Sequence, residues 1–263
     1  MLPAIGLTEL SDILTQYMVA MLRIGAFLLA SPVFGGRFVP LPVRIMATAV
    51  IALPVMEQVD LPSPDTIAGL QFVGTIMAEL TIGLVAGLLL TIMFGAASVA
   101  GDRIASTAGL GFAAQFDPAA GGQTPVVASI FGLFLLSVFI GTDSHLIAIR
   151  MILESYETLP IGGSLNPSVL IAAGIEAGAQ MFALGSAIML PVVAALLLLN
   201  IVIGVLTRSA PQLNVFSFGF PVTMTATILL IYSFAPGLMA SFDGLVKDAL
   251  HLIADMMGAS SNG

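Results

Sequence analysis

The chain has 263 residues, of which 58% are hydrophobic and only 8% are charged, and its formal net charge is −8. Soluble domains carry about 25% charged residues, so this composition predicts an all-α integral membrane protein with several spans. The seven basic residues are scattered, which excludes a nucleic-acid-binding surface, and the lack of cysteine excludes disulfides, thiolate metal sites and thiol catalysis.

Six apolar runs, separated by connections rich in Gly, Pro or charge, set the expected helices in chain order. They are Ile13–Ala30, Val43–Met56, Ile67–Ala100, Val126–Met151, Val169–Thr207 and Val222–Ala240. A simple span needs about 20 residues. The second run is therefore short for a span, whereas the third and fifth are overlong and are expected to tilt, break or project beyond the lipid.

An amphipathic tail, Ser241–Met257, follows the last run. Its apolar residues recur at helical spacing. On the other face, Asp243 and Lys247 are four residues apart, as are His251 and Asp255, so each couple is placed to form an ion pair. No basic segment precedes the first apolar run, and we therefore expect that run to be retained rather than cleaved as a signal peptide.

Charged residues inside the apolar runs are candidates for function, because such residues are rare in membranes and usually face the interior of a helix bundle. They are Arg23, Glu79 and Glu176, with a group in the fourth run, Asp143, His145 and Arg150. One hypothesis is a proton or ion relay. The other is an ion pair between Arg23 and a carboxylate such as Glu79 that fixes packing. We favour the pair, because a relay needs several carboxylates along one pathway.

Signatures of catalysis are missing from the sequence. The two histidines, His145 and His251, lie far apart and outside any His-Glu-x-x-His motif. Neither a Gly-x-Ser-x-Gly elbow nor a phosphate-binding Gly-rich loop with Lys is present. We therefore expect a protein that is not an enzyme and that uses no cofactor and no metal.

Two Gly-x-x-x-Gly motifs lie in the overlong runs, Gly83 with Gly87 in the third and Gly174 with Gly178 in the fifth. Small residues at this spacing let two helices approach closely. The motif fits packing within the chain and contact with another subunit equally well.

Between the third and fourth runs lies a Gly-rich segment, Gly109–Gly122, which also contains Leu110, Phe112 and Phe116. Unpaired backbone groups in hydrocarbon cost several kcal/mol each, so the segment must lie outside the lipid or line a cavity within protein. An ordinary exposed loop is one interpretation, although three large apolar side chains suit a solvated loop poorly. A gate or plug is the other, since glycines supply hinges and phenyl rings can fill an opening.

Three stretches of the chain carry a resemblance to a known family. They read SPVFGGRFVPLPVR at 31–44, GFAAQFDP at 111–118 and LLLLNIVIGVLTRSAPQLNVFSFGFP at 196–221. In sequence, order and spacing they resemble the FliR/SctT export-gate family of type III secretion, and the second stretch is most similar to its flagellar members. The resemblance covers nearly the whole chain.

The resemblance implies a subunit of the flagellar export gate, located in the bacterial inner membrane at the flagellar basal body. Members of the family join FliP and FliQ to form the channel for unfolded flagellar proteins. FlhB, FlhA-like export components, the exported proteins and membrane lipid are further implied partners. The resemblance also implies a FliP-like part, residues 1–167, followed by a FliQ-like helical hairpin and tail, residues 168–263.

Two sets of site residues follow from the same resemblance. The plug loop, residues 109–122, would close the channel at rest, because apolar constrictions exclude water from a pore. Its candidate residues are Gly109, Gly111, Phe112, Phe116, Asp117 and Pro118. The turn between the fifth and sixth runs would be an entrance or a partner contact. Its candidate residues are Arg208, Pro211, Gln212, Asn214, Phe216 and Pro221.

Two other functions stay open. A stand-alone secondary transporter or ion channel could use broken helices near the middle of the long third and fifth runs. Within the family, the alternative is a gate subunit of an injectisome-type secretion system. The first alternative predicts activity in isolated, reconstituted protein, whereas a gate subunit should be inert without its partners.

Overall fold

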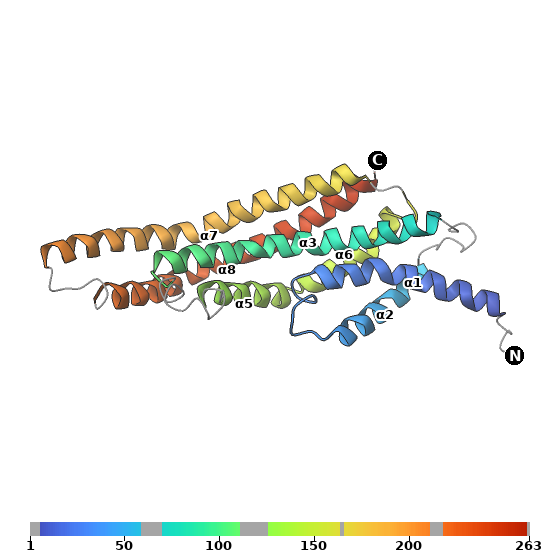
Figure 1. The fold of residues 1–263 in the computed structure, drawn as a ribbon, viewed down its shortest axis with the longest axis horizontal. Coiled ribbons are helices and arrows are strands. Elements are labelled where there is room, and N and C mark those ends of the chain that lie inside the picture. The colour runs from blue at the N-terminus through green and yellow to red at the C-terminus, as the bar shows by residue number, and fades with distance from the viewer. Residues whose placement is uncertain (1–5, 59–69, 111–125, 164–165, 211–217, 262–263) are drawn as a thin grey trace. The chain divides into compact units, whose positions relative to one another are not determined.

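The fold consists of helices throughout the part of the chain that the structure, a computed structural model, describes: residues 6–58, 70–110, 126–163, 166–210 and 218–261 (Figure 1). In chain order the helices are α1 (Leu7–Ala30), α2 (Leu41–Gln58), α3 (Leu70–Thr107), α5 (Val126–Gly141), α6 (Ser144–Thr158), α7 (Pro167–Ser209) and α8 (Phe220–Ser261). The all-α class expected from the sequence is confirmed.

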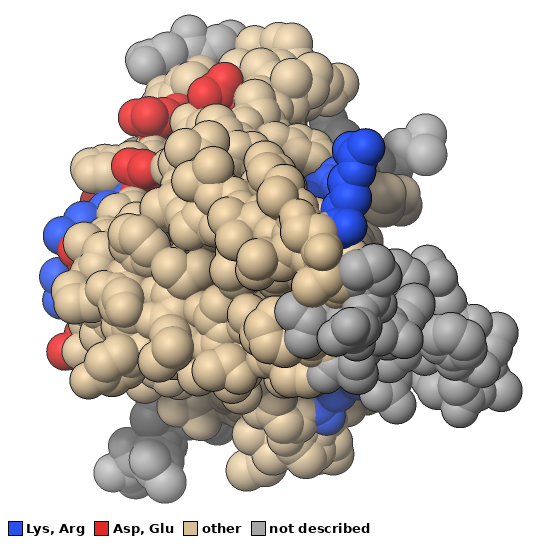
Figure 2. Space-filling view, turned by 90° about the vertical axis from the view of Figure 1, so that its left-hand side faces the viewer, with Lys and Arg blue, Asp and Glu red and all other residues tan. Residues whose placement is uncertain are grey.

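Four helices, α1, α3, α7 and α8, are long and apolar enough to cross a membrane, and the number of spans rises to five if α5 and α6 together form one broken span. Helix α2 is apolar but shorter, as its run predicted. The protein surface in Figure 2 is mostly uncharged, with charged side chains in a few small groups. Length and apolar composition together define an integral membrane protein.

The fourth run is interrupted, and its two halves form α5 and α6. Asp143, between them, has a left-handed backbone with φ 56°. Asp tolerates this conformation better than most side chains do. Its carbonyl oxygen then accepts hydrogen bonds from the amides of Leu146 and Ile147, which begins α6. Asp143 thus acts as a helix boundary inside the fourth run.

The overlong runs form single helices. Helix α3, from the third run, has 38 residues, and α7, from the fifth, has 43, with Pro191 inside it. Helix α8 has 42 residues, with Pro236 inside it. The sixth run and the amphipathic tail, which the sequence pattern separates, form one helix because no helix-breaking residue lies between Ala240 and Phe242. The predicted pair of Asp243 and Lys247 is confirmed at 2.7 Å.

The described residues pack into two compact units. Unit 1 comprises Met1–Ile92, Asp143–Ala177 and Asp248–Gly263, and unit 2 comprises Met93–Thr142 and Gly178–Lys247. Helices α3, α7 and α8 each contribute residues to both units. The FliP-like and FliQ-like parts, residues 1–167 and 168–263, divide the chain differently, and that division stays a prediction.

In unit 1, the first glycine motif brings α3 against α1. A Cβ atom added at Gly83 would lie 2.1 Å from the carbonyl oxygen of Arg23, and one at Gly87 would lie 2.7 Å from the Cβ atom of Ala30. Only glycine fits such a distance, so this motif serves packing within the chain. A Cβ atom added at Gly174 would meet no heavy atom within 4 Å, so in the described chain the second motif does not mark such a close approach.

In unit 2, two pairs of aromatic rings join neighbouring helices. Phe94 of α3 meets Phe139 of α5 edge to face, with ring centroids 5.3 Å apart, and Phe131 of α5 meets Phe242 of α8 at 5.7 Å. A Cβ atom at Gly101 would lie 2.3 Å from the Cα atom of Ala128, so α3 and α5 approach closely. These contacts join α5 to both α3 and α8.

Candidate functional site

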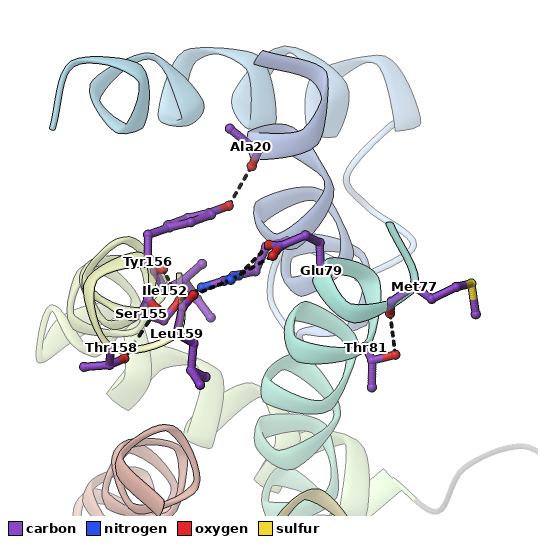
Figure 3. A network of polar contacts seen from close by, with 10 residues as sticks. Ala20, Met77, Glu79, Thr81, Ile152, Ser155, Tyr156, Thr158 and Leu159 are labelled. Atoms are coloured by element: carbon purple, nitrogen blue, oxygen red, sulfur yellow. Dashed lines mark hydrogen bonds and ion pairs between the residues drawn. The ribbon is translucent and has the colours of Figure 1, made fainter. Parts of the chain in front are cut away.

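A buried polar cluster in unit 1 centres on Arg23 of α1. Its Nε atom lies 2.8 Å from Oε2 of Glu79, and its Nη2 atom donates to Oε1 of the same carboxylate at 3.0 Å (Figure 3). The two side chains are 0% and 1% exposed. The ion pair predicted between these residues is therefore confirmed, and its two parallel hydrogen bonds fix the relative position of α1 and α3.

Helix α6 completes the cluster. Arg23 also donates from Nη1 to the hydroxyl of Ser155 at 2.9 Å and from Nη2 to the carbonyl oxygen of Leu159 at 2.8 Å. The guanidinium carbon faces the ring of Tyr156, 4.1 Å from the ring centroid, and the Tyr156 hydroxyl donates to the carbonyl oxygen of Ala20 (Figure 3). Ser155 and Tyr156 of α6, and Leu159 directly after it, were not among the residues that sequence reasoning singled out.

The chemistry of this cluster favours packing over proton transfer. Both oxygens of Glu79 accept hydrogen bonds from Arg23, and the side chains of Ser155 and Tyr156 are each only 1% exposed. A second carboxylate, which a relay would need, does not contact Arg23 among the described residues. Buried charges of this kind are tolerated when they are paired and hydrogen-bonded.

Glu176, the third charged residue predicted to face a bundle interior, lies exposed on α7 in the described chain. In the single chain this position does not face other helices, and its role inside a membrane assembly stays a prediction. The neighbouring apolar side chains Ile171 and Ile175 are also exposed, at 63% and 70%. This stretch of α7 therefore presents a charged residue within an apolar surface.

A second candidate site in unit 2 surrounds the end of α3, where the Gly-rich segment begins. Gly109 has a left-handed backbone, with φ 82°. Its amide bonds to the carbonyl oxygen of Ser106 at 3.1 Å, and the amide of Leu110 bonds to that of Ala105 at 2.9 Å. This pair of hydrogen bonds is the Schellman motif that ends many helices at a glycine.

Helices α7 and α8 each donate a hydrogen bond to the end of α3. The side-chain amide of Asn200 donates to the carbonyl oxygen of Thr107 at 3.0 Å, and the hydroxyl of Thr223 donates to that of Ala108 at 3.1 Å. A Cβ atom added at Gly109 would lie 3.0 Å from the ring of Phe220. We call Gly109, Asn200, Phe220 and Thr223 the α3 anchor.

The structure has a pocket of about 420 Å³ in unit 1 and another of about 300 Å³ in unit 2. The smaller adjoins the α3 anchor and includes Ser106, Asn200, Gly204 and Thr223 in its lining. No titratable side chain lines it, and no group of three or more His, Cys, Asp or Glu residues among the described ranges could hold a metal. The polar groups of the α3 anchor are suited to binding the backbone at the end of α3.

The site residues implied by the resemblance are described only in part. Gly109 belongs to the α3 anchor, whereas Gly111, Phe112, Phe116, Asp117 and Pro118 lie outside the described residues. In the second set, Arg208 is exposed in the last turn of α7 and Pro221 in the first turn of α8. Pro211, Gln212, Asn214 and Phe216 lie outside the described residues. The roles of both sets stay predictions.

The long apolar helices and their exposed apolar surfaces define an all-helical integral membrane protein. Residues 14–249 match the model of the family described as bacterial export proteins, family 1. The chain is 32% identical to the flagellar biosynthetic protein FliR of Escherichia coli K12, with 93% of each chain covered. It is 28% identical to FliR of Aquifex aeolicus, over 84% of this chain and 85% of that protein. The chain belongs to this family of bacterial export proteins.

Proposed function

We propose that this chain is a subunit of the flagellar type III protein export gate in the bacterial inner membrane, at the flagellar basal body. The observation that carries the proposal is the family match over residues 14–249, together with relatives named as flagellar biosynthetic proteins along nearly their whole length. The chain has no enzymatic task in this proposal. It joins FliP and FliQ in the channel for unfolded flagellar proteins and works beside FlhB and FlhA-like components.

The apolar surface of α7 and α8 supports a role that depends on partners. Exposed side chains include Leu198 at 67%, Ile201 at 63%, Ile228 at 69% and Tyr232 at 80%. Contiguous exposed apolar surface is covered by lipid or by another protein. In the proposed assembly, α7 and α8 form the FliQ-like hairpin and pack against neighbouring subunits, with the turn from Arg208 to Pro221 at a partner contact.

The geometry of the α3 anchor supports the proposal that residues 109–122 form a plug. A segment that closes a channel needs one fixed end and freedom beyond it. The end of α3 is held by hydrogen bonds from two other helices, at Thr107 and Ala108, and the chain leaves it at Gly109. In the proposed mechanism, residues 109–122 lie across the channel at rest, and an exported chain displaces them about this fixed point.

Co-purification tests the assembly. A tagged chain expressed with the FliP and FliQ proteins of the same organism should retain both through detergent extraction. If the chain alone transports an ion or a solute after reconstitution, and neither protein accompanies it, the stand-alone transporter is correct instead. Rescue of motility in a strain lacking its own FliR separates the flagellar gate from an injectisome-type gate, which would leave motility absent.

A further inference from the structure

The larger pocket, in unit 1, is an apolar groove between α1, α2 and α3. Residues that line it include Met18, Leu22, Gly25, Ile45, Leu80 and Leu84. Its volume of about 420 Å³ lies within the range of small-molecule sites. Met18 and Ile45 are 67% and 55% exposed, so the groove opens to the outer surface of the chain. That surface belongs to helices that cross or adjoin the membrane.

The groove has one charged residue in its lining, Arg44 in the first turn of α2. The only other polar side chain there is that of Thr48, and its hydroxyl already donates to the carbonyl oxygen of Arg44 at 2.8 Å. Arg44 donates from Nη2 to the carbonyl oxygen of Gly36 at 2.6 Å, while its buried Nε atom lacks a hydrogen-bond partner in the described chain. Among the described residues, no carboxylate forms an ion pair with Arg44.

Arg44 lies beyond the end of a candidate membrane span. The candidate span of α1 ends at Ala30, and Arg44 follows the connection that joins α1 to α2. The lining residues of α1 extend back from Leu29 to Met18, a length of roughly 16 Å at 1.5 Å per helical residue. A cation at one end of an apolar groove of this length complements a phosphate that carries an acyl chain.

We propose that this groove binds one anionic phospholipid. The acyl chain lies along α1 against the carbon-rich walls, and the phosphate accepts hydrogen bonds from the guanidinium of Arg44. The uncompensated charge of Arg44 selects an anionic headgroup over a zwitterionic one. The site is independent of the channel and of the α3 anchor, so it can stand if the proposed gating role fails.

Electron paramagnetic resonance of spin-labelled lipids tests the site. The full chain is reconstituted in phosphatidylcholine bilayers, and spin-labelled phosphatidylglycerol is compared with spin-labelled phosphatidylcholine. We expect the motionally restricted population to favour phosphatidylglycerol by roughly five-fold, as one basic residue near a membrane provides. Equal restriction of the two probes by the unaltered protein would overturn the proposal.

Three variants locate the selectivity. Arg44→Gln should bring the preference close to one-fold, and Arg37→Gln, which removes an exposed arginine of the same connection, should retain it. Gly25→Leu keeps Arg44 but fills the groove, since the added Cβ atom lies 3.4 Å from Thr48 Cγ2; it should also abolish the preference. Preference that survives both Arg44→Gln and Gly25→Leu, or that Arg37→Gln removes equally, contradicts the site. So does a partner helix filling the groove in the assembled gate with no lipid present.

Discussion

Asn200 of α7 and Thr107 of α3 are joined by a hydrogen bond of 3.0 Å from the side-chain amide to the backbone carbonyl oxygen. The bond satisfies one of the carbonyl groups that every helix leaves unpaired at its end. It also fixes the point from which the Gly-rich segment departs, two residues later. The side chain of Asn200, a polar residue in an apolar run, therefore holds the backbone at the end of α3. Removing this hydrogen bond should weaken the attachment of the Gly-rich segment that follows.

Asn200→Ala and Thr223→Val should each weaken the α3 anchor. Loss of one such hydrogen bond costs about 1 kcal/mol. We expect each variant to fold and assemble but to raise the leak of a small membrane-impermeant solute through the gate, measured by its uptake into cells. Thr225→Val is the matched control, because the exposed hydroxyl of Thr225 bonds only to the carbonyl oxygen of Pro221 in its own helix. Leak that is equal in all three variants would count against the anchor.

Gly109→Ala should destabilise the protein. The left-handed backbone at φ 82° costs a residue with a Cβ atom about 1 kcal/mol, and that atom would lie 3.0 Å from the ring of Phe220. Gly132→Ala, inside α5 with no heavy atom within 4 Å of the added Cβ atom, should be neutral or stabilising. Thermal unfolding of the purified chains in detergent compares them, and equal melting temperatures would show that the Schellman geometry is dispensable.

Arg23→Met and Glu79→Met should each reduce stability strongly, by about 3–5 kcal/mol, because each leaves a buried charge without its partner. The double variant should recover much of this loss, since no charge remains buried. Lys247→Ala, which breaks an exposed pair, should cost at most about 1 kcal/mol. Unfolding midpoints and motility are both measured. A double variant that is stable but exports nothing would favour a relay over packing.

The two glycine motifs should respond differently to larger side chains. Gly83→Leu should disrupt the chain itself, because even a Cβ atom would lie 2.1 Å from the carbonyl oxygen of Arg23. Gly174→Leu should leave the isolated chain folded, since that position is open within 4 Å, but should reduce co-purification with FliP and FliQ. Unchanged recovery of both partners with Gly174→Leu would place the subunit contact elsewhere.

The sequence predicted the helical class and the Arg23–Glu79 pair because both depend on simple rules. Apolar runs become helices in a membrane, and a buried cation needs a carboxylate. The other members of the cluster, Ser155 and Tyr156, could not be placed, because their register depends on where α6 begins. The start of α6 depends on the left-handed backbone of Asp143, which no local sequence pattern predicts.

The α3 anchor lay partly within reach of sequence reasoning. A glycine directly after a long apolar run is a common helix end, and a single Asn in a run of Leu and Ile has few ways to satisfy its amide. Thr223, by contrast, resembles the other threonines of α8, and only packing shows that its hydroxyl also reaches α3. Sequence reasoning did not predict that α8 is continuous. The change from the sixth apolar run to the amphipathic tail resembles a helix boundary, although no helix-breaking residue lies there.

The most direct measurement is ion leak through the assembled gate after residues 111–122 are removed, with the α3 anchor kept intact. Membranes carrying the variant with FliP and FliQ should conduct ions at rest, and a variant in which only Phe112 and Phe116 become Ser should leak to an intermediate degree. A gate that assembles fully and stays as tight as the unaltered one after the deletion would contradict the plug.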